Sequence, residues 1–381
     1  MTRHSSQGRW SLGPPRRFTR NLLLPATVTG RPLLLKYTRN HAEARAEIAG
    51  HHLLAGHYRV PELHARLRVP GGRLLLYERL PIGPGHGLLL DLLNTEQPSR
   101  ELRTYLDDLT AHYRAVIRRT AHRADPRTIV RKLYWDRAAP GGRLDQYYAT
   151  AAPVLTDGTT DLPLSHLRDY TLHINEHHVR LDWDATLASL TQHFGSGEPV
   201  WAALTQGDPT DLNLAHPLAW LDFDTAGANS ILGEFANFLW YTTALGGWIV
   251  PTYNPAAFAD HPATFAHIVA NTPELRHTSI DTADRALRIS YRPRLSAPRR
   301  LAATVYWHQL VQPIATHLWP GVPLGKLLRP YVAMRILAVH DVTLLAPRDR
   351  MLLFARLAEV MDPGFDPASF FLTSEAPCPA P

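Results

Sequence analysis

Residues 206–227, QGDPTDLNLAHPLAWLDFDTAG, place Asp208, Asn213 and Asp222 close together around an apolar segment. Acidic side chains this close repel one another, so their clustering indicates that a positive charge lies between them. The intervening segment reads as a tight hairpin turning at residues 215–217, which brings Asn213 and Asp222 to neighbouring strand ends. Two such oxygen ligands suit Mg²⁺ and leave positions for phosphates and water. Asp208 lies a few residues earlier and is free to orient a hydroxyl that attacks a phosphoryl group.

The chain upstream of this segment indicates a small β-rich unit with one helix. Apolar runs bounded by Gly and Pro predict the strands. For the helix, Asn40 is a suitable N-cap, Glu43 fits a capping box, and Gly56 suits the C-terminal end. The predicted elements are strands over residues 20–30, 31–38 and 72–83 and a helix over residues 40–56.

The pattern becomes mostly helical from about residue 85. Apolar residues within residues 99–121 recur at three- and four-residue steps, which forms one helical face, at Leu102, Leu106, Leu109, Tyr113 and Val116. Further helices are predicted over residues 299–319 and 349–361, and a hairpin over residues 170–183 that turns at Asn175 and Glu176.

These elements predict an α+β, two-lobed architecture. We expect a β-rich N-terminal lobe over residues 1–80, a helical C-terminal lobe carrying the 206–227 loops over residues 81–370, and a disordered tail over residues 371–381.

Composition narrows the class of protein. The 381 residues carry a formal net charge of +6, but the basic residues are scattered, which is more typical of a solvated surface than of a nucleic-acid site. No apolar run approaches the roughly 20 residues that span a bilayer, and a single cysteine, Cys378, fits a reducing compartment. We therefore expect a cytoplasmic protein that binds neither nucleic acid nor membrane. Only Lys36, Lys132 and Lys326 of the 40 basic residues are lysines, so each is a candidate for a specific role.

Residues 206–227 resemble the catalytic and metal-binding loops of the aminoglycoside phosphotransferase-like family, relatives of choline kinases and protein kinases. In that family the loop runs His-Gly-Asp-x-x-x-x-Asn, and an Ile-Asp-[Phe/Trp] segment follows. The resemblance implies a two-lobed, protein-kinase-like fold, with a nucleotide-binding lobe over residues 1–80 and the catalytic and metal-binding loops within residues 81–370. Asp208 would be the catalytic residue. The resemblance also implies that Asn213 and Asp222 are Mg²⁺ ligands and that Glu234 has a structural role behind the site.

The resemblance extends upstream, where LLLKYT is similar to the strand whose lysine binds the ATP phosphates. Lys36 is the candidate, and a glutamate on the next helix should pair with it. We favour Glu47 over Glu43, since Glu47 shares a helix face with residues expected to point inward. YERLPIG is similar to the family's hinge, so backbone groups around Glu78 and Leu80 are expected to bind adenine.

The implied function is an ATP- and Mg²⁺-dependent phosphotransferase that moves the γ-phosphate to a hydroxyl of a small-molecule natural product or metabolite. One alternative is a kinase of Ser/Thr hydroxyls in a ribosomally made peptide, acting with a partner lyase. Another is an inactive pseudokinase or scaffold, because Gln206 stands where the family has His and a Gly-rich phosphate loop is lacking. Asp224 is expected to be a turn residue and Asp211 to be solvated.

Overall fold

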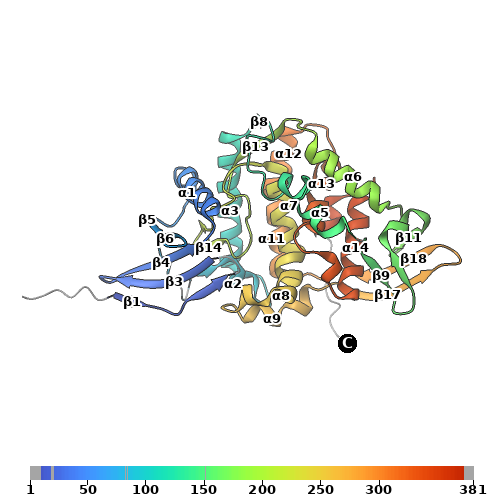
Figure 1. The fold of residues 1–381 in the computed structure, drawn as a ribbon, viewed down its shortest axis with the longest axis horizontal. Coiled ribbons are helices and arrows are strands. Elements are labelled where there is room, and N and C mark those ends of the chain that lie inside the picture. The colour runs from blue at the N-terminus through green and yellow to red at the C-terminus, as the bar shows by residue number, and fades with distance from the viewer. Residues whose placement is uncertain (1–9, 19–20, 82, 84, 151, 373–381) are drawn as a thin grey trace, which may run out of the picture.

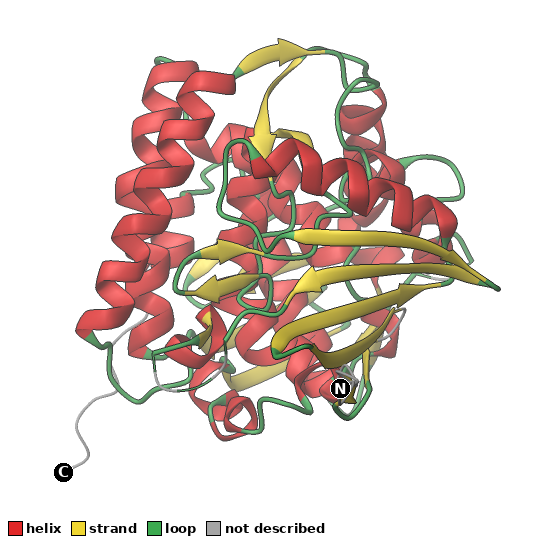
Figure 2. Ribbon diagram, turned by 90° about the vertical axis from the view of Figure 1, so that its left-hand side faces the viewer, coloured by secondary structure: helices red, strands yellow, loops and turns green. Residues whose placement is uncertain are grey.

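A mixed lobe of strands and one helix forms the N-terminal part of the chain, and a larger helical lobe follows (Figure 1). The computed structural model describes residues 10–18, 21–81, 83, 85–150 and 152–372. The N-terminal sheet has the order β1-β3-β4-β6-β5, with β2 paired to β3. Figure 2 shows this sheet in front of the helices of the large lobe. Its strands are β1 (Trp10–Leu12), β2 (Arg16–Phe18), β3 (Asn21–Val28), β4 (Arg31–Thr38), β5 (Leu63–Val69) and β6 (Gly72–Glu78).

The β3–β4 hairpin forms where the sequence predicts it. Thr29 and Gly30 have φ values of 50° and 83°, the left-handed pair that a tight two-residue hairpin turn requires. Antiparallel pairing then aligns Leu23 with Lys36, and Lys36 with Leu75 of β6. Lys36 is therefore held on a central strand, where its side chain is buried.

Helix α1 (His41–Ala55) follows β4 and carries the N-terminal lobe onto the rest of the molecule. The Asn40 side chain accepts hydrogen bonds from two backbone N–H groups of the first turn, as its N-cap role predicts. Gly50 faces the large lobe, and a Cβ atom there would collide with the carbonyl oxygen of Phe223. The missing side chain thus lets α1 approach the segment that follows Asp222.

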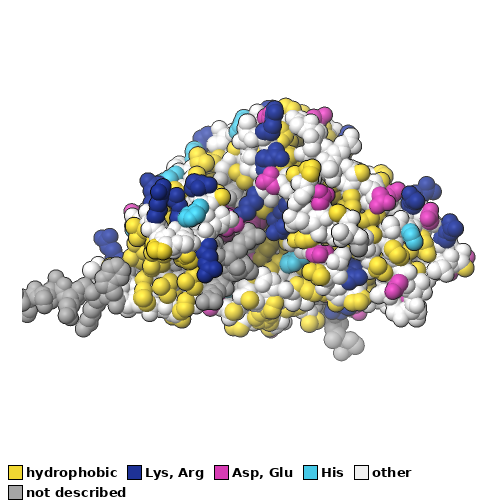
Figure 3. Space-filling model, in the orientation of Figure 1, with side chains coloured by type: hydrophobic (Ala, Val, Ile, Leu, Met, Phe, Trp, Pro, Cys, Tyr) yellow, Lys and Arg dark blue, Asp and Glu magenta, His cyan; other side chains and the backbone are white. Residues whose placement is uncertain are grey.

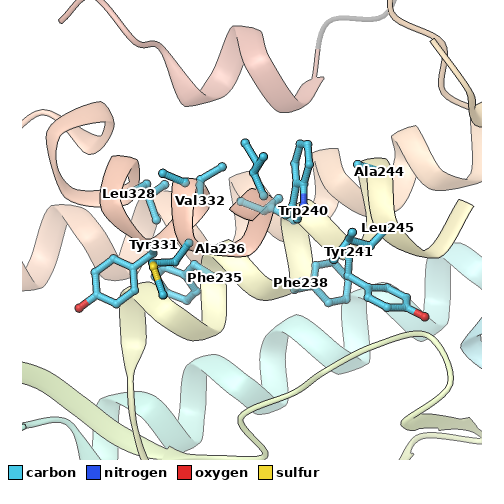
Figure 4. Close-up of a cluster of buried hydrophobic side chains, with 14 of the residues drawn as sticks. Phe235, Ala236, Phe238, Trp240, Tyr241, Ala244, Leu245, Leu328, Tyr331 and Val332 are labelled. Carbon is cyan, nitrogen blue, oxygen red and sulfur yellow. The ribbon is translucent and has the colours of Figure 1, made fainter. Parts of the chain in front are cut away.

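The large lobe is built around long apolar helices. Its main helices are α3 (Arg100–Thr120), α6 (Trp183–Gly195), α7 (Ile231–Trp240), α11 (Ala297–Tyr306), α12 (Gln312–Leu318), α13 (Leu324–Leu337) and α14 (Pro347–Met361). Figure 4 shows α7 and α13 side chains meeting in the core. The rings of Phe238 and Tyr306 stack with centroids 3.9 Å apart, which ties α11 to α7. A π-helical segment, Tyr241–Ile249, continues α7 and is almost wholly buried.

Short strands and helices connect these long helices. They are β7 (Gly87–Leu88), α2 (Leu89–Leu93), β8 (His122–Ala124), α4 (Trp135–Ala138), α5 (Arg143–Tyr148), β9 (Val154–Thr156), β10 (Asp161–Pro163), β11 (Thr171–Ile174), β12 (His177–Val179), β13 (Val200–Thr205), β14 (Leu214–His216), β15 (Ala219–Trp220), β16 (Gly227–Ser230), α8 (Val250–Tyr253), α9 (Ala263–Ala266), α10 (Ile268–Asn271), β17 (Glu274–Asp281), β18 (Ala286–Arg292) and α15 (Pro367–Leu372).

The predicted fold class, a small β-rich lobe joined to a larger helical lobe, is confirmed. The predicted tail over residues 371–381 includes Phe371 and Leu372, which belong to α15, and Phe371 is buried against the core. Residues 373–381 lie outside the described residues. Within the described part of the chain, no helix combines the length and apolarity needed to cross a membrane.

Candidate active site

Lys36 of β4 is the centre of an ion-pair cluster that joins the two lobes. Its Nζ lies 2.9 Å from Glu47 Oε2 of α1 and 2.6 Å from Asp222 Oδ1 of the large lobe. Glu47 also accepts a hydrogen bond from the Tyr77 hydroxyl at 2.9 Å and from the Phe223 backbone N–H at 3.2 Å. The structure thus brings Asp222 to a lysine 186 residues earlier in the chain, and it selects Glu47 as the helix partner of Lys36.

The cluster contains one ammonium group and two carboxylates. Burial opposes the charging of Lys36, but the two carboxylates outweigh it and raise the Lys36 pKa. Burial raises the pKa of Glu47 to about 7, against the opposing effect of Lys36. Asp222 lies partly open to the space between the lobes, with 43% of its side chain exposed. Burial there is outweighed by Lys36, which lowers the Asp222 pKa. One carboxylate is therefore in excess.

Lys132 and Asp224 extend this cluster, and the sequence did not predict that they pair with each other. Asp224 lies in a turn, as expected, and it also forms an ion pair with Lys132 Nζ. Burial and the charge of Asp222 raise the Asp224 pKa, although Lys132 opposes them. The scarcity of lysine in the sequence is the signal that could have pointed to Lys132.

The loop that carries Asp208 is tied directly to the Asp222 segment. Gln206 donates from Nε2 to the carbonyl oxygens of Leu221 at 3.0 Å and Asp222 at 2.6 Å, and its Oε1 accepts from the Asp208 N–H at 2.7 Å. An amide carries both the donors and the acceptor that this bridge needs. Gly207, at φ 88°, packs where a Cβ atom would collide with the Thr225 carbonyl oxygen. The substitution of Gln for His thus preserves a connected loop.

The Asp208 side chain is contacted by Asn237 and Arg335 at one of its two carboxylate oxygens. Its Oδ1 accepts a hydrogen bond from Asn237 Nδ2 at 2.7 Å and lies 3.7 Å from Arg335 Nη2. The side chain is 31% exposed. Both neighbours approach Oδ1, so neither of them occupies Oδ2. Neither Asn237 nor Arg335 was identified from the sequence, since no motif connects them to the loop.

Glu234 lies behind the loop, where the resemblance places it. Its Oε2 accepts from the Gly207 N–H at 3.1 Å and from the Thr205 hydroxyl at 2.9 Å, while Oε1 accepts from the Tyr113 hydroxyl at 2.8 Å. Burial is the main cause that raises the Glu234 pKa to about 7. This side chain shapes the loop from within the core.

Asn213 and Asp222 fit a divalent cation. Asn213 donates from Nδ2 to the Asp208 carbonyl at 2.9 Å, which leaves its oxygen for a ligand. Leu221 N donates to the Asn213 carbonyl at 2.9 Å, so the two predicted ligands lie on adjacent chain segments. Asp222 has a φ of 54°, a left-handed conformation that asparagine and aspartate tolerate best. An amide oxygen and a carboxylate are hard oxygen donors of the kind that Mg²⁺ prefers.

The predicted hinge residues lie at the end of β6. The Glu78 N–H donates to Glu62 O at 2.8 Å, and the Arg79 N–H donates to Pro32 O at 3.2 Å. Both donors are therefore used within the protein. The Leu80 backbone forms no hydrogen bond with another described residue, so Leu80 is the better candidate for contact with a base.

Asp211 is buried, and the expectation that it is solvated is wrong. Its Oδ2 lies 2.8 Å from Arg299 Nη2 of α11, and both side chains are inaccessible to solvent. Burial raises the Asp211 pKa, although Arg299 opposes this effect. The pair ties the Asp208–Asn213 loop to the core of the large lobe.

Figure 3 shows a hollow between the N-terminal part and the large lobe, with Lys or Arg and Asp or Glu side chains beside it. A separate open cavity of about 740 Å³ lies between α3 and the β14–β15 hairpin, lined in part by Tyr105, His216 and Trp220. Its lining includes none of the predicted site residues. The site is thus defined by converging side chains and not by this cavity.

Comparison with known proteins finds no matching protein-family model and no matching curated protein. Among solved structures, the chain is similar to a candidate aminoglycoside phosphotransferase from Ralstonia eutropha, with a TM-score of 0.46 and 16% identity over 94% of this chain and 92% of the other. The apo form of a thermostable mutant of aminoglycoside phosphotransferase APH(4)-Ia aligns with a TM-score of 0.42 and 14% identity over 91% and 95% of the two chains. A ternary complex of an APH(4)-Ia mutant with AMP-PNP and hygromycin B gives 0.39 and 16% over 60% and 73%.

The fold rests on the element order and on the ion pair that joins its lobes. The chain has a small β-rich N-terminal lobe and a larger helical lobe, and these solved structures of aminoglycoside phosphotransferases are the proteins to which it is similar.

Proposed function

We propose that the protein is an ATP- and Mg²⁺-dependent phosphotransferase with a small-molecule hydroxyl as acceptor. One observation carries this proposal: Lys36, Glu47 and Asp222 form a single ion-paired cluster across the lobes, and Gln206 links that cluster to Asp208. Phosphoryl transfer depends mainly on positioning and charge neutralisation, which such a rigid set of charged groups can supply.

Each residue has a distinct role in this proposal. Lys36, oriented by Glu47, would bind the α- and β-phosphates of ATP. Asn213 and Asp222 would hold Mg²⁺, which neutralises phosphate charge when bound. Asp208 Oδ2 would accept the proton of the acceptor's hydroxyl group while the hydroxyl oxygen bonds to the γ-phosphorus of ATP. The bond between the γ-phosphorus and the β,γ-bridging oxygen breaks in the same step, which releases ADP. The proton then passes from Asp208 to solvent.

A small molecule is the proposed acceptor, and two alternatives give different results in one assay. The protein is incubated with Mg²⁺-ATP and separate panels of small hydroxyl compounds and Ser/Thr peptides, and mass spectrometry detects the added phosphoryl group. A peptide kinase would modify the peptides only. A pseudokinase would modify neither panel.

The Asp208→Asn variant tests the mechanism within the same assay. We expect transfer to fall by about 100-fold or more, the usual contribution of a general base, while calorimetry still detects binding of Mg²⁺ and AMP-PNP. Asp184→Asn is a matched control, because Asp184 is exposed on α6 and the net charge changes equally. Normal turnover by Asp208→Asn would refute the assignment.

A further inference from the structure

Arg335 is a buried cation whose hydrogen-bonding groups are largely unused. It lies on α13 and is 3% exposed. Its Nε and Nη1 have no hydrogen-bond partner among the described residues. Its one ion contact, 3.7 Å from Nη2 to Asp208 Oδ1, is too long for a hydrogen bond. A guanidinium has five N–H donors in a fixed plane, and leaving them unpaired in the interior costs free energy.

Two further arginines converge on the C-terminal end of the same helix. Arg137 of α4 and Arg143 of α5 each donate from Nη1 to the Ala338 carbonyl oxygen, at 3.0 Å and 2.9 Å. Because they share one acceptor atom, these two guanidinium groups lie next to each other. Their shared acceptor, Ala338, is the C-cap of α13 and follows Arg335 by three residues, so the three guanidinium groups belong to the same end of the helix. Burial and the charges of Arg335 and Arg143 lower the Arg137 pKa to about 9. Figure 1 shows α5 beside α13.

Helix capping explains part of this arrangement only. Cations near the last carbonyls of a helix are favourable, and one cation is enough for that purpose. Capping uses one donor of Arg137 and gives no role to Arg335, which lies a turn earlier and points to Asp208. His340 Nε2, next to this group, is also buried without a partner among the described residues.

The charges do not balance within this group. The group holds three arginines, and its one carboxylate contact among the described residues is that of Arg335 with Asp208, which the proposed reaction needs for the acceptor's hydroxyl. Like charges held together in a partly buried place repel, and an anion placed between them would relieve this repulsion. Arginine's planar fork matches carboxylate and phosphate oxygens in two-point contacts.

We propose that Arg335, with Arg137 and Arg143, binds an anionic group of the acceptor, a carboxylate or a phosphate, beside the hydroxyl that Asp208 orients. This inference rests on the proposed phosphotransferase function and specifies its substrate class. The acceptor is then a hydroxy acid or a phosphate-bearing alcohol, and a polycation such as an aminoglycoside would be repelled from this place.

Binding of anions without turnover tests the site directly. The probes are inorganic phosphate, D-glycerate and glycerol 3-phosphate, with glycerol as the neutral analogue, and the readout is thermal stabilisation with AMP-PNP and Mg²⁺ present. We expect the anions to stabilise the protein and glycerol not to, with a roughly tenfold or greater loss of anion affinity in Arg335→Gln. Comparing glycerate with glycerol 3-phosphate decides between carboxylate and phosphate.

Two variants make the result specific to the arginine group. Arg103→Gln removes the same charge from the exposed surface of α3 and should bind the anions normally. Lys36→Met should keep anion binding although it weakens nucleotide binding, because the two sites are distinct. If Arg335→Gln does not fold, Arg143→Gln takes its place, with at least a threefold loss expected from one fewer charge contact.

The outcomes separate the two proposals. Unchanged anion affinity in a folded Arg335→Gln protein, or equal losses in Arg103→Gln, would overturn the anion site. Phosphorylation of neutral and anionic acceptors at equal kcat/KM would overturn it as well, while leaving the phosphotransferase function intact. If only kcat falls in Arg335→Gln, equally for every acceptor, Arg335 acts on the transferred phosphoryl group and the proposal is wrong. Arginine-dependent anion binding with no transfer to any acceptor would refute the proposed function alone.

Discussion

Replacing Glu234 by Gln should alter how the stability of the protein depends on pH. Glu234 is 1% exposed and accepts hydrogen bonds from Tyr113, Thr205 and Gly207. Burial is the largest cause that raises its pKa from 4.5 to about 7. The folded protein therefore holds a proton at Glu234 over a pH range in which the unfolded chain has lost it.

The sign and size of the effect follow from that difference. The stabilising contribution is complete below pH 4.5 and is lost as the pH rises through about 7, since ionising the buried carboxyl then opposes folding. Each pKa unit corresponds to about 1.4 kcal/mol. The free energy of unfolding of the wild type, relative to Glu234→Gln, should thus fall by about 2.5 kcal/mol between pH 5 and pH 8.

Urea unfolding at a series of pH values measures this difference. Other titrating groups affect both proteins alike and cancel in the comparison. Glu96→Gln, an exposed carboxylate with the same change of charge, is the control and should show no such trend. If the difference between wild type and Glu234→Gln stays constant from pH 5 to pH 8, the argument that burial controls this carboxyl is wrong.

Three further changes test other contacts. Lys36→Met should weaken binding of Mg²⁺ and AMP-PNP by about tenfold or more in calorimetry, because a charge-assisted contact to phosphate is lost. The control is Lys326→Met, at an exposed position, which should leave this affinity unchanged. Asp211→Asn should lower the free energy of unfolding by about 3 to 5 kcal/mol, since it leaves Arg299 buried without its counter-ion; a loss below 1 kcal/mol in urea unfolding would contradict this. Gly50→Ala should lower the free energy of unfolding by about 1 to 3 kcal/mol and should also lower nucleotide affinity, because the new methyl group pushes α1 away from the large lobe. Unchanged values of both quantities would show that the close contact is dispensable.

Local signals in the sequence were sufficient for several elements. Asn40 caps α1 because its side chain reaches N–H groups only two and three residues away. The apolar face of α3 repeats with the helical period, and the hairpin at Asn175 turns where a residue with positive φ is tolerated. Other elements were missed: β5 and the β17–β18 hairpin carry weaker patterns, and their pairing partners, not their own residues, stabilise them.

For the candidate site too, some features could be predicted from the sequence and others could not. The resemblance to a known family, and not any single motif, led to the prediction that Lys36, Glu47 and Asp222 lie together, and the structure pairs these three side chains. The roles assigned to Asp208 and Asn213 stay predictions. The number of residues between these positions in the sequence does not give the distances between their side chains in the folded protein.

What the sequence alone determined was therefore local: helix caps, turn positions, apolar faces and the order of polar segments along the chain. Only the tertiary structure decided that Asp211 is paired with Arg299, Asp224 with Lys132, and that Arg335 faces Asp208. These partners are 88 or more residues apart, so their contacts depend on how whole helices pack. Burial then sets the charge balance of each group, and burial is a property of the folded chain and not of any segment in it.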